Sequence, residues 1–173
     1  MVTAYWLIPA EPARRYFQDV INDLAERYAA PEFEPHVTLH VGVDCPDKVN
    51  EALSISARRS KPIALRVLNV SNSSEFIKTL FVTFDRSLQL QRLNQSIRKA
   101  AQDSFSTYQL NPHLSLLYKR MSTADRSRLA RLIEVPFTEV TFNSLKAVRC
   151  ISPTKSRVDV DAWRSTAETP LCG

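Results

Sequence analysis

Glycine is scarce in this sequence, since Gly42 and Gly173 are its only two glycines in 173 residues. Phosphate-binding loops of the Walker and dinucleotide types need several glycines, because backbone amides must approach the ligand closely. Both types of loop are therefore excluded. Any phosphate group that this protein handles must be held by side chains.

Cysteines and long apolar runs are also few. Cys45, Cys150 and Cys172 are an odd number without C-x-x-C spacing, so neither a disulfide framework nor a zinc site is indicated. We expect reduced thiols and no metal ion. The early apolar run at residues 4–9 ends in charged residues and is far shorter than the ~18 to 20 residues of a membrane span. It also lacks the basic lead-in of a signal peptide, so we expect a cytoplasmic protein with no membrane partner.

The composition is that of a globular domain, with 44% apolar and 24% charged residues. The length fits one domain, which we expect to be monomeric. A net charge of +5 favours an anionic partner through long-range attraction. The basic residues are scattered through helical patterns instead of forming a tract, so the charge alone identifies no partner.

Apolar periodicity predicts a strand and helix order that begins twice. Strands are expected at about 3–8, 36–43, 63–70, 76–84, 113–118, 137–150 and 156–163, and helices at about 12–28, 46–57, 88–101 and 123–133. These patterns predict a single bilobal domain over residues 1–173, with lobes at about 1–85 and 86–164 and a frayed tail at 165–173.

One pentapeptide pattern occurs at the same place in both halves. Residues 35–39 read PHVTL and residues 112–116 read PHLSL, so two of the three histidines follow a proline and precede a hydroxyl residue by two positions. Side chains alternate along a strand, so each motif presents an imidazole and a hydroxyl on one face and anchors its apolar residue in the core. A lone H-x-T is usually structural, but two copies in equivalent halves favour a site.

The motif residues suit a phosphodiester substrate. Two strands related by a pseudo-twofold would place His36, Thr38, His113 and Ser115 around one cleft. Hydroxyls can donate to non-bridging oxygens, a neutral imidazole can deprotonate water, and an imidazolium can protonate the leaving oxygen. The histidine pKa near 6.5 allows both protonation states near neutral pH. Each histidine could take either role.

His40 is expected on the same strand face as His36 and Thr38. Four residues of strand span about 13 Å, too far for His36 and His40 to bind one ion with bonds near 2 Å. We therefore expect His40 to be a bystander at the edge of the cleft.

Both motifs and their surroundings resemble the 2H phosphoesterase superfamily, and more narrowly its cyclic phosphodiesterase branch. The resemblance rests on FEPHVT at residues 33–38, NPHLSLLY at residues 111–118, YWLIP at residues 5–9 and the spacing of the two motifs. It implies a bilobal α+β fold with pseudo-twofold symmetry, in which two antiparallel sheets surround a central cleft and helices lie outside.

The resemblance also implies roles and substrates. His36 and His113 would be the acid and the base, Thr38 and Ser115 would bind phosphate, and no cofactor would be needed. The substrates would be ADP-ribose 1″,2″-cyclic phosphate, opened to the 1″-phosphate, or nucleoside 2′,3′-cyclic phosphates, opened to 2′-phosphates. Both belong to RNA metabolism such as tRNA splicing.

Further residues are expected near the cleft. The resemblance favours contact between Tyr118 and the substrate. Phe76 and Lys78 lead the strand expected at 76–84, where an aromatic face can stack on a base and an ammonium can attract phosphate. Trp6 and Trp163 are expected to pack in the core.

Two other functions remain open from the sequence. A superfamily enzyme could act on RNA ends or 2′,5′-linked oligonucleotides, which would require a basic groove; no Arg/Lys stripe lies beside the motifs. A non-catalytic nucleotide-binding protein could keep the cleft. The intact histidines and hydroxyls argue against that reading, because a binder needs no pair of titratable groups.

Overall fold

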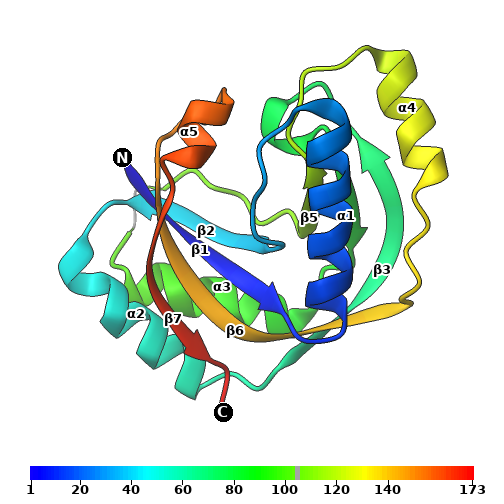
Figure 1. Cartoon of the computed structure of the whole chain (residues 1–173). Helices are drawn as coiled ribbons and strands as arrows, with labels where there is room; N and C mark the ends of the chain where they lie inside the picture. Colours follow the sequence, from blue (N-terminus) through cyan, green and yellow to red (C-terminus); the bar gives the residue numbers. More distant parts are fainter. Residues whose placement is uncertain (104–105) are drawn as a thin grey trace.

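The computed structural model describes residues 1–103 and 106–173, which form an α+β fold (Figure 1). The strands of this part are β1 (Val2–Pro9), β2 (Val37–Val43), β3 (Ile63–Asn72), β4 (Leu80–Phe84), β5 (His113–Leu117), β6 (Glu139–Cys150) and β7 (Arg164–Pro170). The helices are α1 (Ala13–Tyr28), α2 (Pro46–Arg58), α3 (Leu88–Ala100), α4 (Thr123–Leu132) and α5 (Arg157–Asp161), with a 3-10 turn, η1 (Phe76–Lys78). The expected α+β class and antiparallel pairing are confirmed.

The strands join in the order β1-β2-β5-β4-β3-β6-β7, and β1 also pairs with β6. Strand β6 connects the two halves. One of its edges pairs with β1, while the other pairs first with β3 and then with β7. The two sheets expected from the sequence are therefore hydrogen-bonded into one, because β6 is long enough to belong to both.

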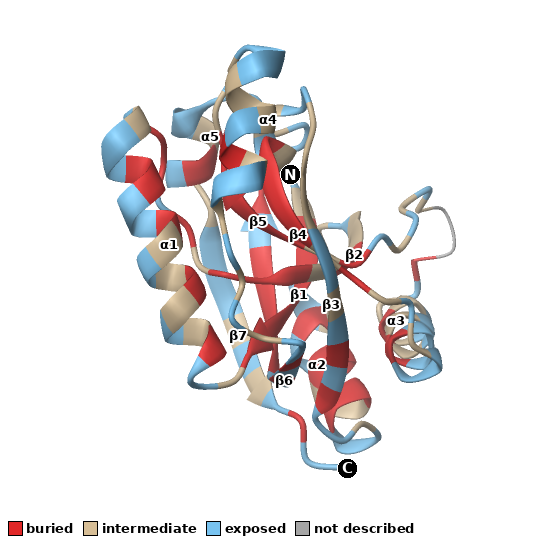
Figure 2. Cartoon of the chain, turned by 90° about the vertical axis from the view of Figure 1, so that its right-hand side faces the viewer, coloured by how far each residue is buried: buried red, intermediate tan, exposed pale blue. Residues whose placement is uncertain are grey.

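The helices cover the sheet in two groups (Figure 1). Helices α2 and α3 pack on each other and contact β2, β6 and β7. Helices α1 and α4 lie on the other side of the picture and contact β5, β3 and β4. Buried residues concentrate on the strands and on the inward faces of the helices (Figure 2). One apolar core therefore runs through both halves.

The helices form where spacing and caps favour them. In α1, Phe17, Ile21 and Leu24 follow helical spacing, and all three are buried. Ser87 accepts a hydrogen bond from the amide of Leu90 and so caps α3, which satisfies a donor that the helix itself leaves free.

The C-terminal region differs from the prediction in two places. The strand expected at 156–163 is wrong, because Ser156 and Asp159 form a capping box that starts helix α5. The frayed tail expected at 165–173 is also wrong, because residues up to Pro170 form β7 and pair with β6. β7 is mostly polar, so its sequence carries little strand signal; its backbone hydrogen bonds hold it in place.

The segment before β4 also differs. The strand expected at 76–84 is shorter, because Phe76 to Lys78 form the turn η1 and β4 starts at Leu80. Strands β3 and β4 precede residue 85, but β3 pairs with β6 and β4 pairs with β5, so strand pairing crosses the expected lobe boundary. The description as one bilobal domain stays a prediction.

A β-bulge in β2 turns His40 away from the cleft. Trp6 pairs with Thr38 and Tyr5 pairs with His40, so Leu39 is an extra residue on β2. His40 consequently shares a face with Tyr5 and is 0% exposed. The expectation that His40 lies on the face of His36 and Thr38 at the edge of the cleft is therefore wrong.

His40 belongs to a buried polar cluster. Its Nε2 lies 3.1 Å from Oδ2 of Asp103, whose side chain is nearly buried. Burial lowers the pKa of His40, although the Asp103 carboxylate opposes this effect. Gly42 sits against the same carboxylate, and a Cβ at this position would overlap Asp103. Glycine is required at position 42 by this close approach.

We expect Gly42→Ala to destabilise the fold. The added methyl group must displace the buried Asp103 carboxylate and its contact with His40, which should lower the free energy of unfolding by about 1 to 3 kcal/mol. Urea unfolding followed by circular dichroism measures the change. Val43→Ala at the neighbouring exposed position is the control and should unfold like the wild type. Equal unfolding midpoints for all three proteins would contradict the packing described.

Candidate active site

The two motifs meet through one pair of equivalent residues. Val37 of β2 pairs with Leu114 of β5, and both occupy the apolar position of the repeated pentapeptide. Pairing of equivalent residues on antiparallel strands is what a local twofold axis produces. An ideal antiparallel register extended by one residue would set His36 across from Ser115 and Thr38 across from His113. The motifs thus meet at the strand pair, and the charge of His113 acts on His36.

Both imidazoles are oriented by the same local hydrogen bond. Nδ1 of His36 lies 2.6 Å from the carbonyl oxygen of Glu34, and Nδ1 of His113 lies 2.7 Å from that of Asn111. A carbonyl oxygen only accepts, so Nδ1 carries the proton in each ring. Nε2 is then the nitrogen left for chemistry in both histidines.

The surroundings of His36 keep its ring neutral. The side chain is buried, and the Trp6 ring stacks on it with centroids 3.7 Å apart. Burial lowers the pKa of His36 to about 3, and the positive charges of His113 and Lys146 act in the same direction. The Glu34 carbonyl opposes this shift without reversing it. His36 is therefore neutral near neutral pH, with a free lone pair on Nε2.

His113 lies in a more open and more balanced environment. It is half-buried, and its ring meets that of Phe81 edge-on at 5.6 Å. Burial lowers its pKa and the charge of Lys78 lowers it further, while the Asn111 carbonyl and the charge of Glu75 raise it. The pKa of His113 is lowered overall, but a nearby carboxylate opposes the shift, a contribution that His36 lacks.

An ion-pair cluster fixes the residue that orients His36. The Glu34 carboxylate binds Nζ of Lys146 at 2.6 and 2.9 Å and an Arg14 nitrogen at 2.6 Å. Lys146 also contacts Glu168 at 2.9 Å and is itself only 8% exposed. In the β1–β6 register Lys146 lies opposite Trp6, the ring that covers His36. The cluster therefore holds both the carbonyl and the aromatic contact of His36.

A cavity of about 410 Å³ opens beside this arrangement. Among the predicted residues, His36, Thr38, Phe76 and Tyr118 line it. The other lining residues come from β1, from β2, from the η1 turn, from the segment after β5 and from the region between the end of β6 and the start of β7: Val2, Ala4, Trp6, Val41, Glu75, Ile77, Arg120, Cys150, Ile151, Ser152, Pro153, Thr154, Lys155 and Trp163. His113 and Ser115 adjoin this lining through the paired strands but are not part of it.

The turn η1 lies against the second motif. The Ser115 hydroxyl donates to the carbonyl oxygen of Ile77 at 2.9 Å. Thr79 anchors the turn by donating to the carbonyl of Lys119 at 2.6 Å. The ammonium of Lys78 lies 4.7 Å from the ring centroid of Phe81. The turn thus brings Lys78 close to His113 and places a carbonyl on the hydroxyl expected to bind phosphate.

Aromatic rings form the wall of the cavity. Tyr118 stacks on Phe33 with centroids 3.7 Å apart and approaches Phe76 at 6.2 Å and Trp163 at 5.9 Å. Burial raises the pKa of Tyr118, so its hydroxyl stays protonated. The expected packing of Trp6 holds, since it is buried, and it also lines the cavity. These rings offer flat apolar faces to a ligand.

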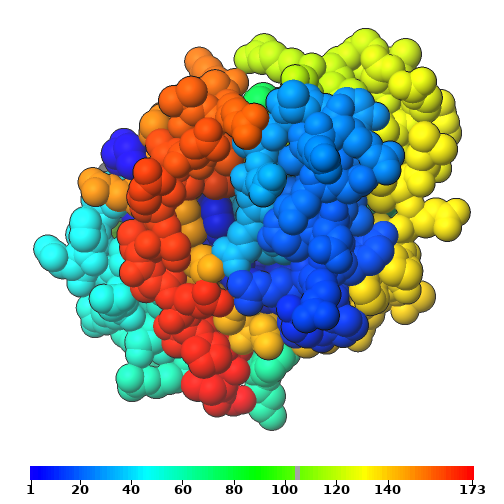
Figure 3. All heavy atoms as spheres, viewed as in Figure 1, coloured from blue at the N-terminus to red at the C-terminus, as the bar shows by residue number. Residues whose placement is uncertain are grey.

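A smaller hollow of about 190 Å³ is lined by both tryptophans, by Glu34 and by Lys146. Figure 3 shows a depression between the orange to red C-terminal segment and the blue segment of α1 and the loop after it, with the dark-blue N-terminal strand at its bottom. The charged cluster thus borders a surface hollow of its own.

The structure brings the predicted residues together with different degrees of exposure. The motifs that hold His36 with Thr38 and His113 with Ser115 are joined by the pairing of Val37 with Leu114. Phe76 and Lys78 belong to η1 instead of the strand expected there, because the chain turns before β4. The catalytic and binding roles of these residues, and of Tyr118, stay predictions.

Sequence reasoning missed several site residues. Glu34 lies inside the quoted motif, but only its contact with Lys146 reveals its part. Lys146 is 110 positions from His36, and its place depends on the β1–β6 register, which no local pattern shows. The loop at 150–155 contributes Lys155, and the segment after β5 contributes Arg120. These residues can be assigned to the site only once the order of the strands is known.

Two further features are absent from the described residues. In residues 1–103 and 106–173, no group of three His, Cys, Asp or Glu side chains is arranged to hold a metal ion. Within the same residues, every helix is too short or too polar to cross a bilayer.

Comparisons with known proteins agree with this geometry. The model of a family described as cyclic phosphodiesterase-like protein matches residues 1–168. A cyclic phosphodiesterase from Arabidopsis thaliana is 21% identical over 170 residues, which cover 96% of this chain and 93% of the relative.

Solved structures share the fold. The protein TT0787 of Thermus thermophilus superposes with a TM-score of 0.62 at 15% identity, covering 99% of this chain and 98% of that one. LigT of Escherichia coli, crystallised with 3′-AMP, gives a TM-score of 0.60 at 12% identity, with the same two coverages of 99% and 98%. Such structures are 2H phosphoesterases, as the paired motifs indicate. Because the family model spans nearly the whole chain and both motifs, this protein belongs to the cyclic phosphodiesterase-like family.

Proposed function

We propose that this protein hydrolyses small cyclic phosphodiesters by acid and base catalysis at His36 and His113. The pairing of Val37 with Leu114 carries the proposal, because it brings two imidazoles and two hydroxyls from distant parts of the chain to one place. Membership of the cyclic phosphodiesterase-like family supports phosphodiester hydrolysis.

We assign the base to His36. Its ring is neutral because burial depresses its pKa, and its proton sits on Nδ1 because the Glu34 carbonyl accepts there. Nε2 therefore offers a lone pair on the cleft side. It removes a proton from water as the water oxygen bonds to phosphorus, a transfer worth about 10²- to 10⁴-fold in rate.

We assign the acid to His113. Burial lowers its pKa, but the Asn111 carbonyl and Glu75 oppose this shift and the ring is more exposed than that of His36, so His113 is the better placed of the two to carry a proton on Nε2 as well as on Nδ1. It gives this proton to the ribose oxygen as the P–O bond of the ring breaks. One water is consumed, one P–O bond forms and one breaks. Proton exchange with solvent then returns both histidines to their starting states.

The substrates are ADP-ribose 1″,2″-cyclic phosphate, giving the 1″-phosphate, and nucleoside 2′,3′-cyclic phosphates, giving 2′-phosphates. The cavity of about 410 Å³ has the size of a small-ligand site. Its aromatic wall suits stacking of a base. LigT, which shares the fold, has been crystallised with 3′-AMP, with NADP⁺ and with ATP, which supports a small nucleotide as ligand.

We expect His36→Ala and His113→Ala each to lower kcat for a 2′,3′-cyclic nucleotide by about 10²- to 10⁴-fold, because each variant loses one proton transfer. Hydrolysis by the wild type should persist in EDTA. Steady-state kinetics measure the rates, and phosphorus NMR on both substrate classes identifies which ester bond breaks.

The third histidine is the matched control for these variants. His40→Gln can keep a hydrogen bond to Asp103 and lies outside the cavity, so it should retain most of the activity. Wild-type rates in either alanine variant, or loss of activity in EDTA, would disprove the proposed mechanism.

The pH profile should respond to the charges beside His113. Lys78 lowers the pKa of His113 and Glu75 raises it, and the acid must be protonated to act. Lys78→Met should therefore move the alkaline limb of kcat/KM to higher pH, and Glu75→Gln should move it to lower pH. The two variants are controls for each other. Shifts in the same direction, or no shift, would argue against His113 as the acid.

The protonation of His36 should respond to Lys146. The positive charge of Lys146 lowers the pKa of His36, so Lys146→Met should raise it, which NMR titration of the imidazole protons can follow. Arg149→Met is the matched control. Arg149 lies on β6, as Lys146 does, but its ion pair is with Asp44 and it is not among the charges that act on His36. If Lys146→Met left the pKa of His36 unchanged, the proposed effect of Lys146 on the protonation of His36 would be wrong.

A further inference from the structure

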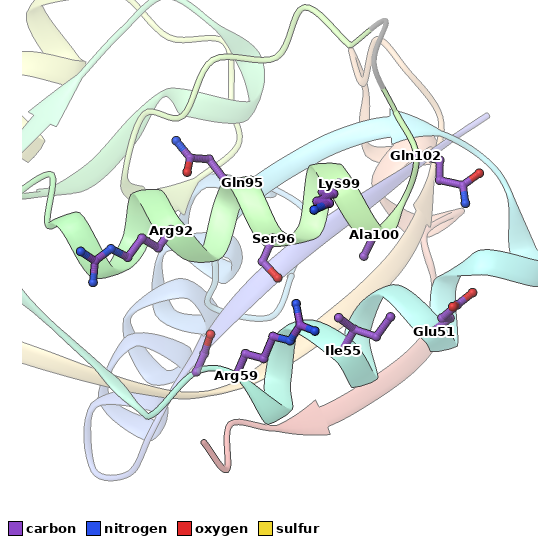
Figure 4. Close-up of a pocket in the computed structure, with 10 residues that line it drawn as sticks. Glu51, Ile55, Arg59, Arg92, Gln95, Ser96, Lys99, Ala100 and Gln102 are labelled. Atoms are coloured by element: carbon purple, nitrogen blue, oxygen red, sulfur yellow. The ribbon is translucent and has the colours of Figure 1, made fainter.

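The groove between α2 and α3 is larger than the cavity at the histidines. Its volume is about 630 Å³, compared with about 410 Å³, and the two share no lining residue. Figure 4 shows the helices side by side with the lining side chains between and above them. The lining residues are Glu51, Ile55, Arg59, Ser60, Arg92, Gln95, Ser96, Lys99, Ala100 and Gln102.

The groove carries more positive than negative charge. Arg59, Arg92 and Lys99 line it, while Glu51 is its one carboxylate. In the part of the chain that the structure describes, none of these three cations forms an ion pair. By contrast, Lys146 is neutralised by two carboxylates. The charges of the groove are therefore available to an anionic ligand.

The cations are arranged along a line. Arg92, Ser96 and Lys99 recur at helical spacing, so they lie along one face of α3. Seven residues of helix separate Arg92 from Lys99, about 10 Å at 1.5 Å per residue. Arg59, at the end of α2, points across the groove toward α3 (Figure 4).

A second hollow extends the groove along α3. Its volume is about 540 Å³, and Gln95, Lys99 and Gln102 line both hollows. Arg98 and the carboxylate of Asp103 also line this second hollow, so Arg98 and Lys99 outnumber its one acid. Between the two helices, the hydroxyl oxygens of Ser56 and Ser96 lie 3.1 Å apart. The result is an elongated channel and not a closed pocket.

Donor side chains dominate the lining. Arg, Lys, Ser and Gln supply seven of its ten residues, and these are the residue types that contact the phosphates and sugars of nucleic acids. None of the ten is aromatic, so the groove offers no platform on which a base could stack. These side chains suit binding to a nucleic-acid backbone independently of the base sequence.

We infer that the α2–α3 groove binds the sugar–phosphate backbone of single-stranded RNA. An elongated polyanion fits the line of cations, and the polar donors between them can meet ribose and phosphate oxygens. This interaction is separate from the hydrolysis proposed above, because the groove contains neither histidine motif. It would hold RNA on the protein while the cavity at His36 stays free.

The test is fluorescence anisotropy with a labelled 12-nucleotide 2′-O-methyl RNA, whose blocked 2′-hydroxyls prevent formation of a cyclic phosphate. If three phosphates are neutralised, log K should fall with log salt with a slope of about −2, from roughly 0.7 per phosphate. The combined variant Arg59→Gln, Arg92→Gln and Lys99→Gln should bind about tenfold or more weakly and lose most of this slope. Its hydrolysis of a 2′,3′-cyclic nucleotide should equal that of the wild type.

A charge-matched variant separates the groove from net charge. Arg15→Gln, Arg66→Gln and Arg131→Gln remove the same charge at exposed positions elsewhere and should leave RNA binding near the wild-type level. Three results would overturn the inference: no RNA binding by the wild type, equal loss in both combined variants, or equally tight binding of a polyglutamate peptide of the same charge. None of them bears on the cyclic nucleotide assay, which tests the hydrolysis separately.

Discussion

The hydrogen-bonded contact between Val37 and Leu114 is the constraint on which the remaining architecture depends. It is the one residue pair recorded between β2 and β5 in the described chain, and it completes the ring of strands that β6 closes on the other side. Beyond it, the backbone carbonyls along β2 are met by side chains. Asn94, Ser106 and Tyr108 donate to the carbonyls of residues 39, 41 and 38. One paired position is enough to join the motifs, because these side chains form hydrogen bonds with other backbone groups of β2.

The two histidines have similar backbone-derived orientations but different surroundings, as the proposed acid and base roles require. Both imidazoles donate from Nδ1 to a carbonyl two residues earlier, so their geometry is nearly equivalent. Their neighbours differ. One ring is covered by Trp6 and is affected by the charge of Lys146, while the other is affected by the charges of Lys78 and Glu75. A duplicated motif can thus supply two copies of one group, and the side chains around each copy can set different proton affinities.

Much of this site could be predicted because its information is local. The pentapeptides, with their alternation of polar and apolar residues, were sufficient to identify His36, His113 and the neighbouring hydroxyls and to place the apolar residue between them in the core. The main helices follow from apolar spacing in the same way. The family resemblance added the fold class. All of these features are encoded within short windows of the sequence.

What could not be predicted depends on distant pairing. The bulge at Leu39, which reverses the direction of His40, is visible only as a shift in the register with β1. Strand β7 has few apolar residues and exists because β6 offers a free edge. The place of Lys146 beside Trp6 likewise depends on strand order.

The hydrogen bond from Ser115 to the carbonyl oxygen of Ile77 has a consequence for ligand binding. The Ser115 hydroxyl already has an acceptor, so a ligand that uses this hydroxyl must replace that carbonyl oxygen. A phosphate oxygen is a stronger acceptor than a peptide carbonyl, whereas an uncharged ligand offers no such advantage. In the proposed mechanism, the second motif would therefore favour charged over uncharged ligands before the hydrolysis begins.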